Sequence, residues 1–227
     1  MLSGSASPGK AAPKPMLNPA EMGMTDEGAL RVLRSIPGYV EAFKAAFPGD
    51  AQPVTIDNLG RAIGAFERGL ATKSRWDDYL AGKKDALSDK ELEGLSTFLN
   101  VGCIGCHTGP QVGASMFQVA GLIEPWPKQG DQGRIEVTQT STDKMVFKVP
   151  TLKNIAKTGP YFHDGSVAKL DDAVRTMGRH QLGVELNDEE IGAIVAFLGA
   201  FSGDLPQEYI RPPVLPPDGP STPRAGT

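Results

Sequence analysis

Two cysteines and a histidine stand within five consecutive residues of this 227-residue chain. The segment reads Cys103, Ile104, Gly105, Cys106, His107, and the sequence contains no other cysteine. The pattern C-x-x-C-H is the attachment site of c-type haem. Two thiols at this spacing reach the vinyl groups on one porphyrin edge, and the next residue then lies under the iron. A neutral imidazole binds the iron through one nitrogen and needs an acceptor for its other N–H.

Three other uses of these residues explain less of the pattern. A structural disulfide leaves His107 without a role. A Cys₂His₂ zinc site would need His163 and His180, which are 17 residues apart where such sites have three to five. A thioredoxin-like redox pair follows a strand, whereas a helical pattern precedes Cys103. Covalent haem is therefore the prediction.

The residue on the other face of the iron decides what the haem does, because a thioether ligand closes the site and raises the reduction potential. Met116 is nine residues from His107 and should stay on the proximal side, and Met145 reads as a core residue. Met177 ends an amphipathic pattern directly before Gly178, so its side chain projects where the chain turns. The full set of candidates on the C-terminal side of His107 is Met116, Met145, Met177, His163 and His180.

Helical patterns account for most of the remaining sequence and must position the motif. Capping residues predict helix starts at Thr25, Thr55, Ser74 and Ser88, and the patterns over 166–177 and 187–201 predict two more helices. The helix that begins after Ser88 leads directly into the motif, and we expect its apolar face to carry Leu92, Leu95 and Leu99. The alternating stretch 133–149 favours a small hairpin or an extended loop. The expected fold class is mainly α with long loops.

Composition excludes some functions. The net charge of −4 gives no basic footprint for nucleic acid, and no apolar run is long enough to span a membrane.

The first ten residues lack the apolar core of a secretory signal, so either a signal has been removed or the chain begins partway through a longer protein. Residues 1–15 read as a flexible lead-in, and seven prolines in 206–227 predict an extended tail that is either loose or laid across a surface.

At several separate blocks the sequence resembles the bacterial dihaem cytochrome c peroxidases, over about 85% of the chain. The matching blocks are LNPAEMGM at 17–24, AFER at 65–68, GCIGCHTG at 102–109, VPTLKN at 149–154 and TGPYFHDGS at 158–166, followed by Met177 and HQLG at 180–183. Members of that family have an N-terminal peroxidatic haem and a C-terminal haem with His/Met ligation that receives electrons. The motif resembles the C-terminal one, so the resemblance implies that His107 and Met177 are axial ligands of one covalent haem c. A subfamily with a distal tyrosine oxidises a protein substrate, and Met177 argues against that branch.

The resemblance also implies roles that need a second haem domain. Glu21 matches the glutamate that assists O–O cleavage, and the carbonyls of Thr158 and Pro160 match two calcium ligands. A family member should carry a second C-x-x-C-H upstream of residue 17, and this sequence has none. We therefore expect Glu21 to be an exposed glutamate near a helix start, and the calcium site to be incomplete, because a hard cation needs six or more oxygens. His163 is expected to be hydrogen-bonded beside the haem, and His180 to be solvated.

The expected organisation is a lead-in at 1–15, helices at 16–85 that resemble the end of the peroxidatic domain, a cytochrome c-type haem domain at 86–206 and a Pro-rich tail at 207–227. The resemblance implies the electron-transfer haem portion of a peroxidase that reduces hydrogen peroxide with electrons from a small cytochrome c or copper protein. The missing peroxidatic domain or a second subunit would be a partner, homodimer formation stays open, and haem attachment implies the periplasm. A stand-alone monohaem electron carrier and a chain whose haem is never attached are the alternatives.

Overall fold

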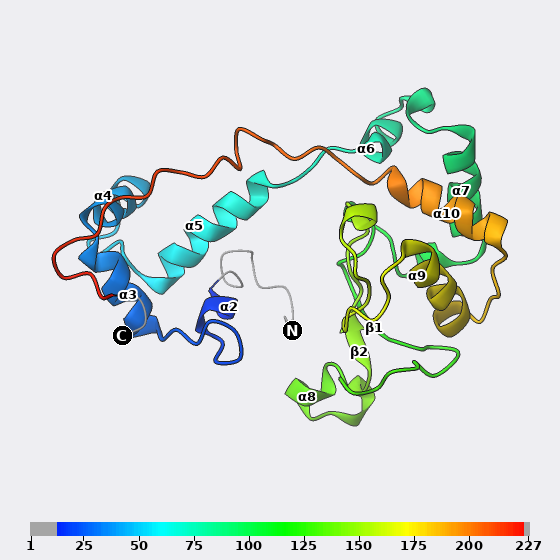
Figure 1. The fold of residues 1–227 in the computed structure, drawn as a ribbon, viewed down its shortest axis with the longest axis horizontal. Helices are drawn as coiled ribbons and strands as arrows, with labels where there is room; N and C mark the ends of the chain where they lie inside the picture. Colours follow the sequence, from blue (N-terminus) through cyan, green and yellow to red (C-terminus); the bar gives the residue numbers. More distant parts are fainter. Residues whose placement is uncertain (1–12, 225–227) are drawn as a thin grey trace. The chain divides into compact units, whose positions relative to one another are not determined.

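The computed structural model describes residues 13–224, so most of the expected lead-in at 1–15 lies outside the described residues. As predicted, the described chain is mainly helical with little sheet (Figure 1). It forms two compact units, which we call unit 1 (residues up to 71, together with the segment from 205 onward) and unit 2 (72–204). Among the described residues, no helix is both long enough and apolar enough to cross a membrane.

In its described part, unit 1 contains four helices. They are α2 (Lys14–Leu17), α3 (Asp26–Ser35), α4 (Pro37–Ala46) and α5 (Ile56–Gly69). The Thr25 hydroxyl accepts a hydrogen bond from the Gly28 N–H at 3.0 Å, and Thr55 caps α5 in the same way. Each cap satisfies an N–H that a helix start leaves unpaired. Both predicted threonine caps are therefore confirmed.

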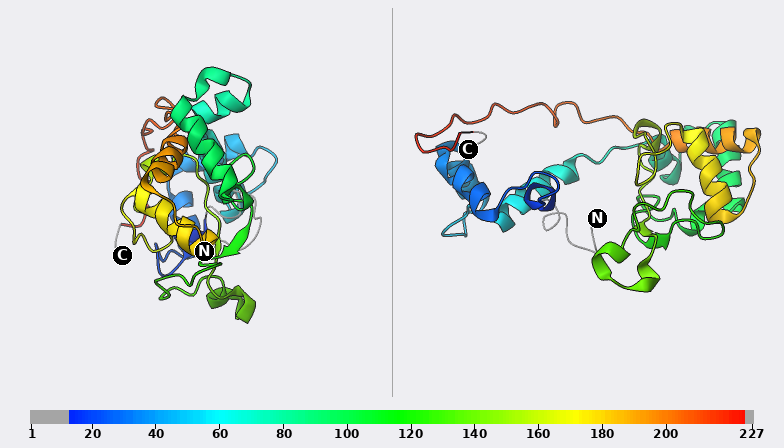
Figure 2. Two further views of the ribbon diagram at one scale, coloured as in Figure 1. Left: turned by 90° about the vertical axis from the view of Figure 1, so that its right-hand side faces the viewer. Right: turned by 60° about the horizontal axis from the view of Figure 1, so that its bottom comes forward.

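The segment from residue 205 onward lies across the helices of unit 1 (Figures 1 and 2). The Tyr209 ring stacks on Phe66 of α5, with 5.3 Å between centroids, and its hydroxyl donates to the Phe66 carbonyl at 3.0 Å. Near the end of the segment, the Ser35 hydroxyl bonds the Thr222 hydroxyl at 3.0 Å. The tail was expected to be either loose or laid across a surface, and its described part is laid across a surface.

Unit 2 is built around two helices that pack side by side, α7 and α10 (Figures 1 and 2). Its elements are α6 (Arg75–Leu80), η1 (Lys84–Ala86), α7 (Asp89–Asn100), η2 (Cys103–Gly105), β1 (Phe117–Val119), α8 (Ile135–Thr138), η3 (Ser141–Asp143), β2 (Val146–Lys148), η4 (Ile155–Lys157), α9 (Leu170–Thr176), η5 (Met177–Leu182) and α10 (Asp188–Gly199). Capping boxes at Ser88 and Asn187 start the two central helices.

A glycine sets the face that α7 turns toward α10. A Cβ at Gly94 would lie 1.9 Å from the Ala193 carbonyl oxygen, so only glycine permits this approach. The buried residues of α7 are accordingly Glu91, Gly94 and Phe98, while Leu99 is 46% exposed. Of the three leucines expected on one apolar face, Leu92 and Leu95 are half-buried and Leu99 is exposed, because the helix turns Gly94 toward α10.

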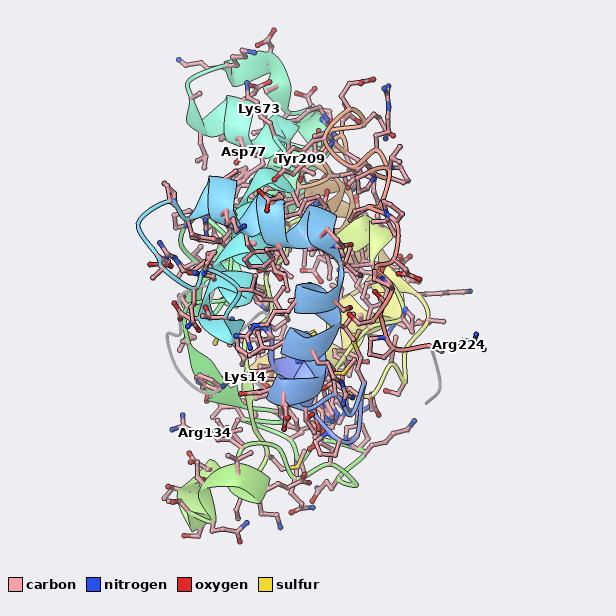
Figure 3. All side chains as sticks on the ribbon, turned by 90° about the vertical axis from the view of Figure 1, so that its left-hand side faces the viewer. Lys14, Lys73, Asp77, Arg134, Tyr209 and Arg224 are labelled. Atoms are coloured by element: carbon pink, nitrogen blue, oxygen red, sulfur yellow. The ribbon has the colours of Figure 1, made fainter. Side chains whose placement is uncertain are left out.

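Unit 2 begins earlier in the chain than the expected boundary after residue 85. The Trp76 ring meets Phe197 and Phe201 edge to face, with centroids 5.3 and 5.5 Å apart, so α6 belongs to the core of unit 2. At the beginning of α6, where Figure 3 labels Lys73 and Asp77, the Asp77 carboxylate accepts from the Ser74 N–H at 2.8 Å.

The long loops of unit 2 contain one small sheet. Strand β1 pairs antiparallel with β2, in a register that places Gln118 opposite Phe147. Within 133–149 only the end is a strand, because 135–138 forms α8, so the hairpin prediction is wrong for that stretch. Met145 is 6% exposed, as expected for a core residue. Two of these loops reach the motif at His107, through the backbone of Val112 and of Pro150.

Candidate functional site

The motif lies on a tight turn that follows α7. Gly102 takes φ +98°, a left-handed conformation that ends the helix, and η2 follows directly. The Cys103 carbonyl accepts hydrogen bonds from the N–H groups of Cys106 (3.3 Å) and His107 (3.0 Å). This turn holds both thiols and the imidazole in one short segment.

Both cysteines are free thiols and half-buried. The Cys103 side chain packs against the main core cluster of unit 2, and burial raises the pKa of this thiol to about 11. The thiol is therefore protonated at neutral pH. Free thiols beside an apolar core are what covalent haem attachment requires, since each must add to a vinyl group of a largely apolar ring.

The His107 imidazole is held in its neutral form. Burial lowers its pKa, and the nearby backbone of Val112 and Pro150 opposes that shift only in part. Its ring lies 6.5 Å from that of Phe98, measured between centroids. The buried Nδ1 completes no hydrogen bond with any described residue. A neutral imidazole is the form that binds a metal.

The other two histidines lie elsewhere in unit 2. His163 is exposed and stacks on Phe147 with 4.0 Å between centroids, and within 13–224 its ring forms no hydrogen bond of the expected kind. His180 is half-buried against Trp126, and its Nδ1 lies 3.0 Å from the Pro125 carbonyl, so it is not simply solvated. Over residues 13–224, no three His, Cys, Asp or Glu side chains come together as a metal site. The residues therefore fit a haem better than a zinc ion.

Met177 begins η5, a short π-helical segment that continues α9. Val174, one turn earlier, packs on the same core cluster as Cys103. Further along η5, the Leu182 side chain lies 3.9 Å from the position of a Cβ built on Gly102. The last residue of η5 therefore lies beside Gly102, whereas Met177 is the first residue of η5 and is half-buried.

The remaining predicted site residues are exposed. Glu21 lies in unit 1, where its carboxylate accepts from the Asn18 side-chain amide at 2.8 Å. Thr158 and Pro160 lie together in the loop after η4. Sequence reasoning missed Phe98 and the segment 112–114, which both border His107. The only sequence signal was the glycine at 113, in a stretch with several others.

Residues 4–85 match the family model "Di-haem cytochrome c peroxidase". The chain is 47% identical to a cytochrome c551 peroxidase of Nitrosomonas europaea, over 93% of this chain and 63% of the relative. It is 41% identical to a cytochrome c551 peroxidase of Pseudomonas aeruginosa, over 95% of this chain and 63% of the relative. Residues 4–85 are thus similar to that family model, and most of the chain is similar to part of these two peroxidases.

The fold is similar to that of a solved protein. The crystal structure of a MauG-like protein associated with microbial copper homeostasis matches with a TM-score of 0.75 and 25% identity, covering 91% of this chain and 71% of that one. The chain spans less than two thirds of the length of the two curated relatives. The match therefore leaves more than a third of each relative without a counterpart in this chain.

Proposed function

We propose that these residues form the electron-transfer portion of a cytochrome c peroxidase and hold one covalent haem. The observation that carries the proposal is the pair of free thiols next to a neutral imidazole, all three half-buried, on one turn at the end of α7. The identity to peroxidases of this family over more than nine tenths of the chain supports it.

In this proposal each residue of the motif has a defined task. Cys103 and Cys106 would each hold the haem through one thioether bond, made by adding the S–H across a vinyl group with no atom lost. His107 provides the proximal ligand, and burial keeps its imidazole free of the second proton that would block binding. When bound, the haem supplies a one-electron couple at its iron.

Met177 is proposed as the second axial ligand. Two contacts of its neighbours support this assignment: Val174 of α9 packs on the core around Cys103, and Leu182, at the other end of η5, lies beside Gly102. A thioether in the sixth position raises the reduction potential and keeps peroxide from the metal. This portion would then move electrons and leave the reaction with peroxide to another haem.

The proposal assigns the partners accordingly. Electrons come from a small cytochrome c or copper protein, and hydrogen peroxide is reduced to water at a haem outside these 227 residues. Thioether attachment places the protein in the periplasm. Glu21 acts as acid/base only beside that second haem. Thr158 and Pro160 supply two carbonyls of a calcium site whose other oxygens come from elsewhere, because two ligands are too few.

The test uses the chain expressed with covalent haem attachment. We expect one haem per chain, the weak near-infrared absorption of ferric iron bound to thioether sulfur, and slow carbon monoxide binding to the reduced protein. Met177→Ala should abolish that absorption and speed carbon monoxide binding, whereas Met145→Leu should change neither. Rapid binding in the unaltered chain would remove Met177 from the proposal.

A stand-alone electron carrier is the second candidate, because unit 2 contains Cys103, Cys106, His107 and Met177 by itself. The peroxidase portion and the stand-alone carrier are distinguished by measuring peroxide turnover with a reduced electron donor. Adding a peroxidatic haem domain from a relative should give turnover if the chain is part of a peroxidase. A carrier would give none, and strong turnover by the isolated chain would contradict the division of labour.

A further inference from the structure

The segment that begins with Met177 has little apolar burial to stabilise it. Helix α9 is only seven residues long, and the π-helical segment η5 follows it directly. The buried residue of η5 is Gly178, which has no side chain to pack. Short helices are marginal unless tertiary contacts stabilise them, and π-helical turns are rare and occur often at functional sites. Contacts with another part of the chain must therefore hold η5 in place.

The side chain of Gln181 joins η5 to the loop that follows β1. Its Nε2 donates to the Val119 carbonyl at 3.0 Å, and its Oε1 accepts from the Gly121 N–H at 3.1 Å. One amide thus pairs with two backbone groups of the same loop, as a donor and as an acceptor. A Cβ at Gly121, where φ is +76°, would lie 2.4 Å from the backbone nitrogen of Trp126. The amide of Gln181 is therefore anchored on a tightly closed loop.

The other contacts between η5 and this loop come from the two preceding residues. The His180 carbonyl accepts from two consecutive N–H groups of the loop, both at 3.1 Å, and its Nδ1 lies 3.0 Å from the Pro125 carbonyl. Arg179 pairs with Glu124 at 3.0 Å, but these side chains are 57% and 45% exposed, so the pair contributes little. Gln181 is half-buried, where losing a hydrogen-bond partner is costly. It is therefore the side chain of η5 whose loss should matter most.

We propose that Gln181 is a positioning residue for Met177: its amide fixes the end of η5 on the loop 119–126 and so keeps the thioether in the sixth position at the iron. This inference rests on the proposed ligation by Met177. Val174 holds the other side of Met177 against the core of unit 2, so η5 is held on both sides of the ligand. Ligands at functional sites depend on such supporting contacts for their geometry. Gln181 belongs to the block HQLG at 180–183, to which no role has been assigned above.

The test compares three variants of the protein with covalent haem. Gln181→Leu keeps the bulk of the side chain, removes both hydrogen bonds and adds no group that can bind iron. Gln181→Glu keeps the acceptor for the Gly121 N–H and loses the donor to the Val119 carbonyl. The matched control is Gln118→Leu on β1. The Gln118 amide oxygen accepts from the adjacent Val119 N–H at 2.8 Å, and within 13–224 it forms no hydrogen bond with η5.

Carbon monoxide can bind the reduced iron only when the thioether has left it, so its binding rate measures how often Met177 leaves. We expect Gln181→Leu to raise that rate about tenfold, because the net loss of two hydrogen bonds changes an equilibrium constant by about that factor. Gln181→Glu should give a smaller rise, and Gln118→Leu a change of less than about twofold. The near-infrared absorption of the ferric protein should weaken in the same order.

Hydrogen exchange in the unaltered protein covers the case in which Gln181→Leu fails to fold. The Gly121 N–H should be protected from exchange, because it donates to Gln181. Equal carbon monoxide rates in Gln181→Leu and Gln118→Leu overturn the inference alone, even if Gln181→Leu melts at a lower temperature, since a purely structural residue would give that result. A Gly121 N–H that exchanges as fast as an open loop also overturns it. Rapid carbon monoxide binding in the unaltered protein overturns the proposed ligation by Met177 as well.

Discussion

Unit 1 and unit 2 differ in where their stability comes from. Among the described residues, the buried apolar side chains of unit 1 are Ala29, Ile36, Phe43 and Val54, whereas unit 2 has a contiguous core around Phe197. Unit 1 depends on capped helices and on the returning tail. Unit 2 depends on contacts between residues far apart in sequence. The difference indicates that unit 2 has the larger apolar core of the two.

The loops of unit 2 add a second contrast. Residues 101–123 contain no Asp, Glu, Lys or Arg, yet Ile104, Leu122 and Ile123 are between 41% and 60% exposed. An uncharged loop with exposed apolar side chains is what we expect where a large apolar group completes the core. On the proposed function, that group is the haem.

Removing the haem should give the largest effect and confine it to unit 2. The double variant Cys103→Ser, Cys106→Ser should lose all covalent haem, detected by haem staining after denaturing electrophoresis. Both tryptophans of the chain, Trp76 and Trp126, lie in unit 2, so their fluorescence follows that unit. We expect the fluorescence to lose its cooperative thermal transition.

The helical circular dichroism of unit 1 should persist in the same sample. Ser115→Ala, on the same uncharged loop, is the control and should keep both the haem and the transition. A haem-free protein whose transition keeps its midpoint would contradict the dependence of unit 2 on a bound group.

A smaller effect should separate the two cores. Phe197 is 1% exposed and contacts the rings of Trp76, Phe98 and Phe201, so Phe197→Ala should cost about 3–5 kcal/mol of unfolding free energy. Phe43→Ala in unit 1 should lie at the low end of that range, because Phe43 is 8% exposed and contacts only Phe47 among the aromatic pairs of the described chain. Denaturant titrations with fluorescence and circular dichroism measure both. Equal costs would remove the contrast.

The smallest effect concerns charge and depends on pH. The Arg75 guanidinium holds the pKa of Glu91 below its ordinary value of 4.5, with hydrogen bonds from Ser88 adding to the shift and burial opposing it. Because the folded pKa is the lower one, this stabilisation is complete above pH 4.5 and is lost as the pH falls through the folded pKa. Arg75 is 54% exposed, so we expect Glu91→Gln to cost about 1 kcal/mol at pH 7.

The difference in unfolding free energy between Glu91→Gln and the unaltered protein should disappear when the urea titrations are repeated near pH 3. In unit 1, Glu41→Gln breaks the exposed pair with Lys44 and should cost less than about 0.5 kcal/mol. A gap at Glu91 that does not change with pH would assign its effect to packing.

Local features of the fold could be predicted from the sequence. The caps at Thr25, Thr55 and Ser88 depend on residues three positions apart, so the sequence contains all that determines them. The buried face of α7 could not be predicted in the same way. It depends on the approach of Gly94 to Ala193, which is 99 residues later in the sequence.

The candidate site, too, has one part that could be predicted from the sequence and one part that could not. The turn with Cys103, Cys106 and His107 is contiguous, so the five residues of the motif are enough to predict its chemistry. The surroundings of His107 come from Gly113 and Pro150, and only the folded chain places their backbones beside its ring. No pattern of side chains marks such a contact, because the groups involved are backbone carbonyls and a missing Cβ.

Unit 1 is interrupted in sequence, since 72–204 separates its helices from the segment that completes it. The residues at which the chain enters and leaves unit 2 lie next to each other. Ser74 forms a β-bridge with Gly203, and the Asn154 side chain hydrogen-bonds both Thr72 and Gly203 at 2.9 Å. A ribosome makes the helices of unit 1 first and Tyr209 among the last residues. Those early helices must therefore wait, with Phe66 uncovered, until the whole inserted unit has been synthesised.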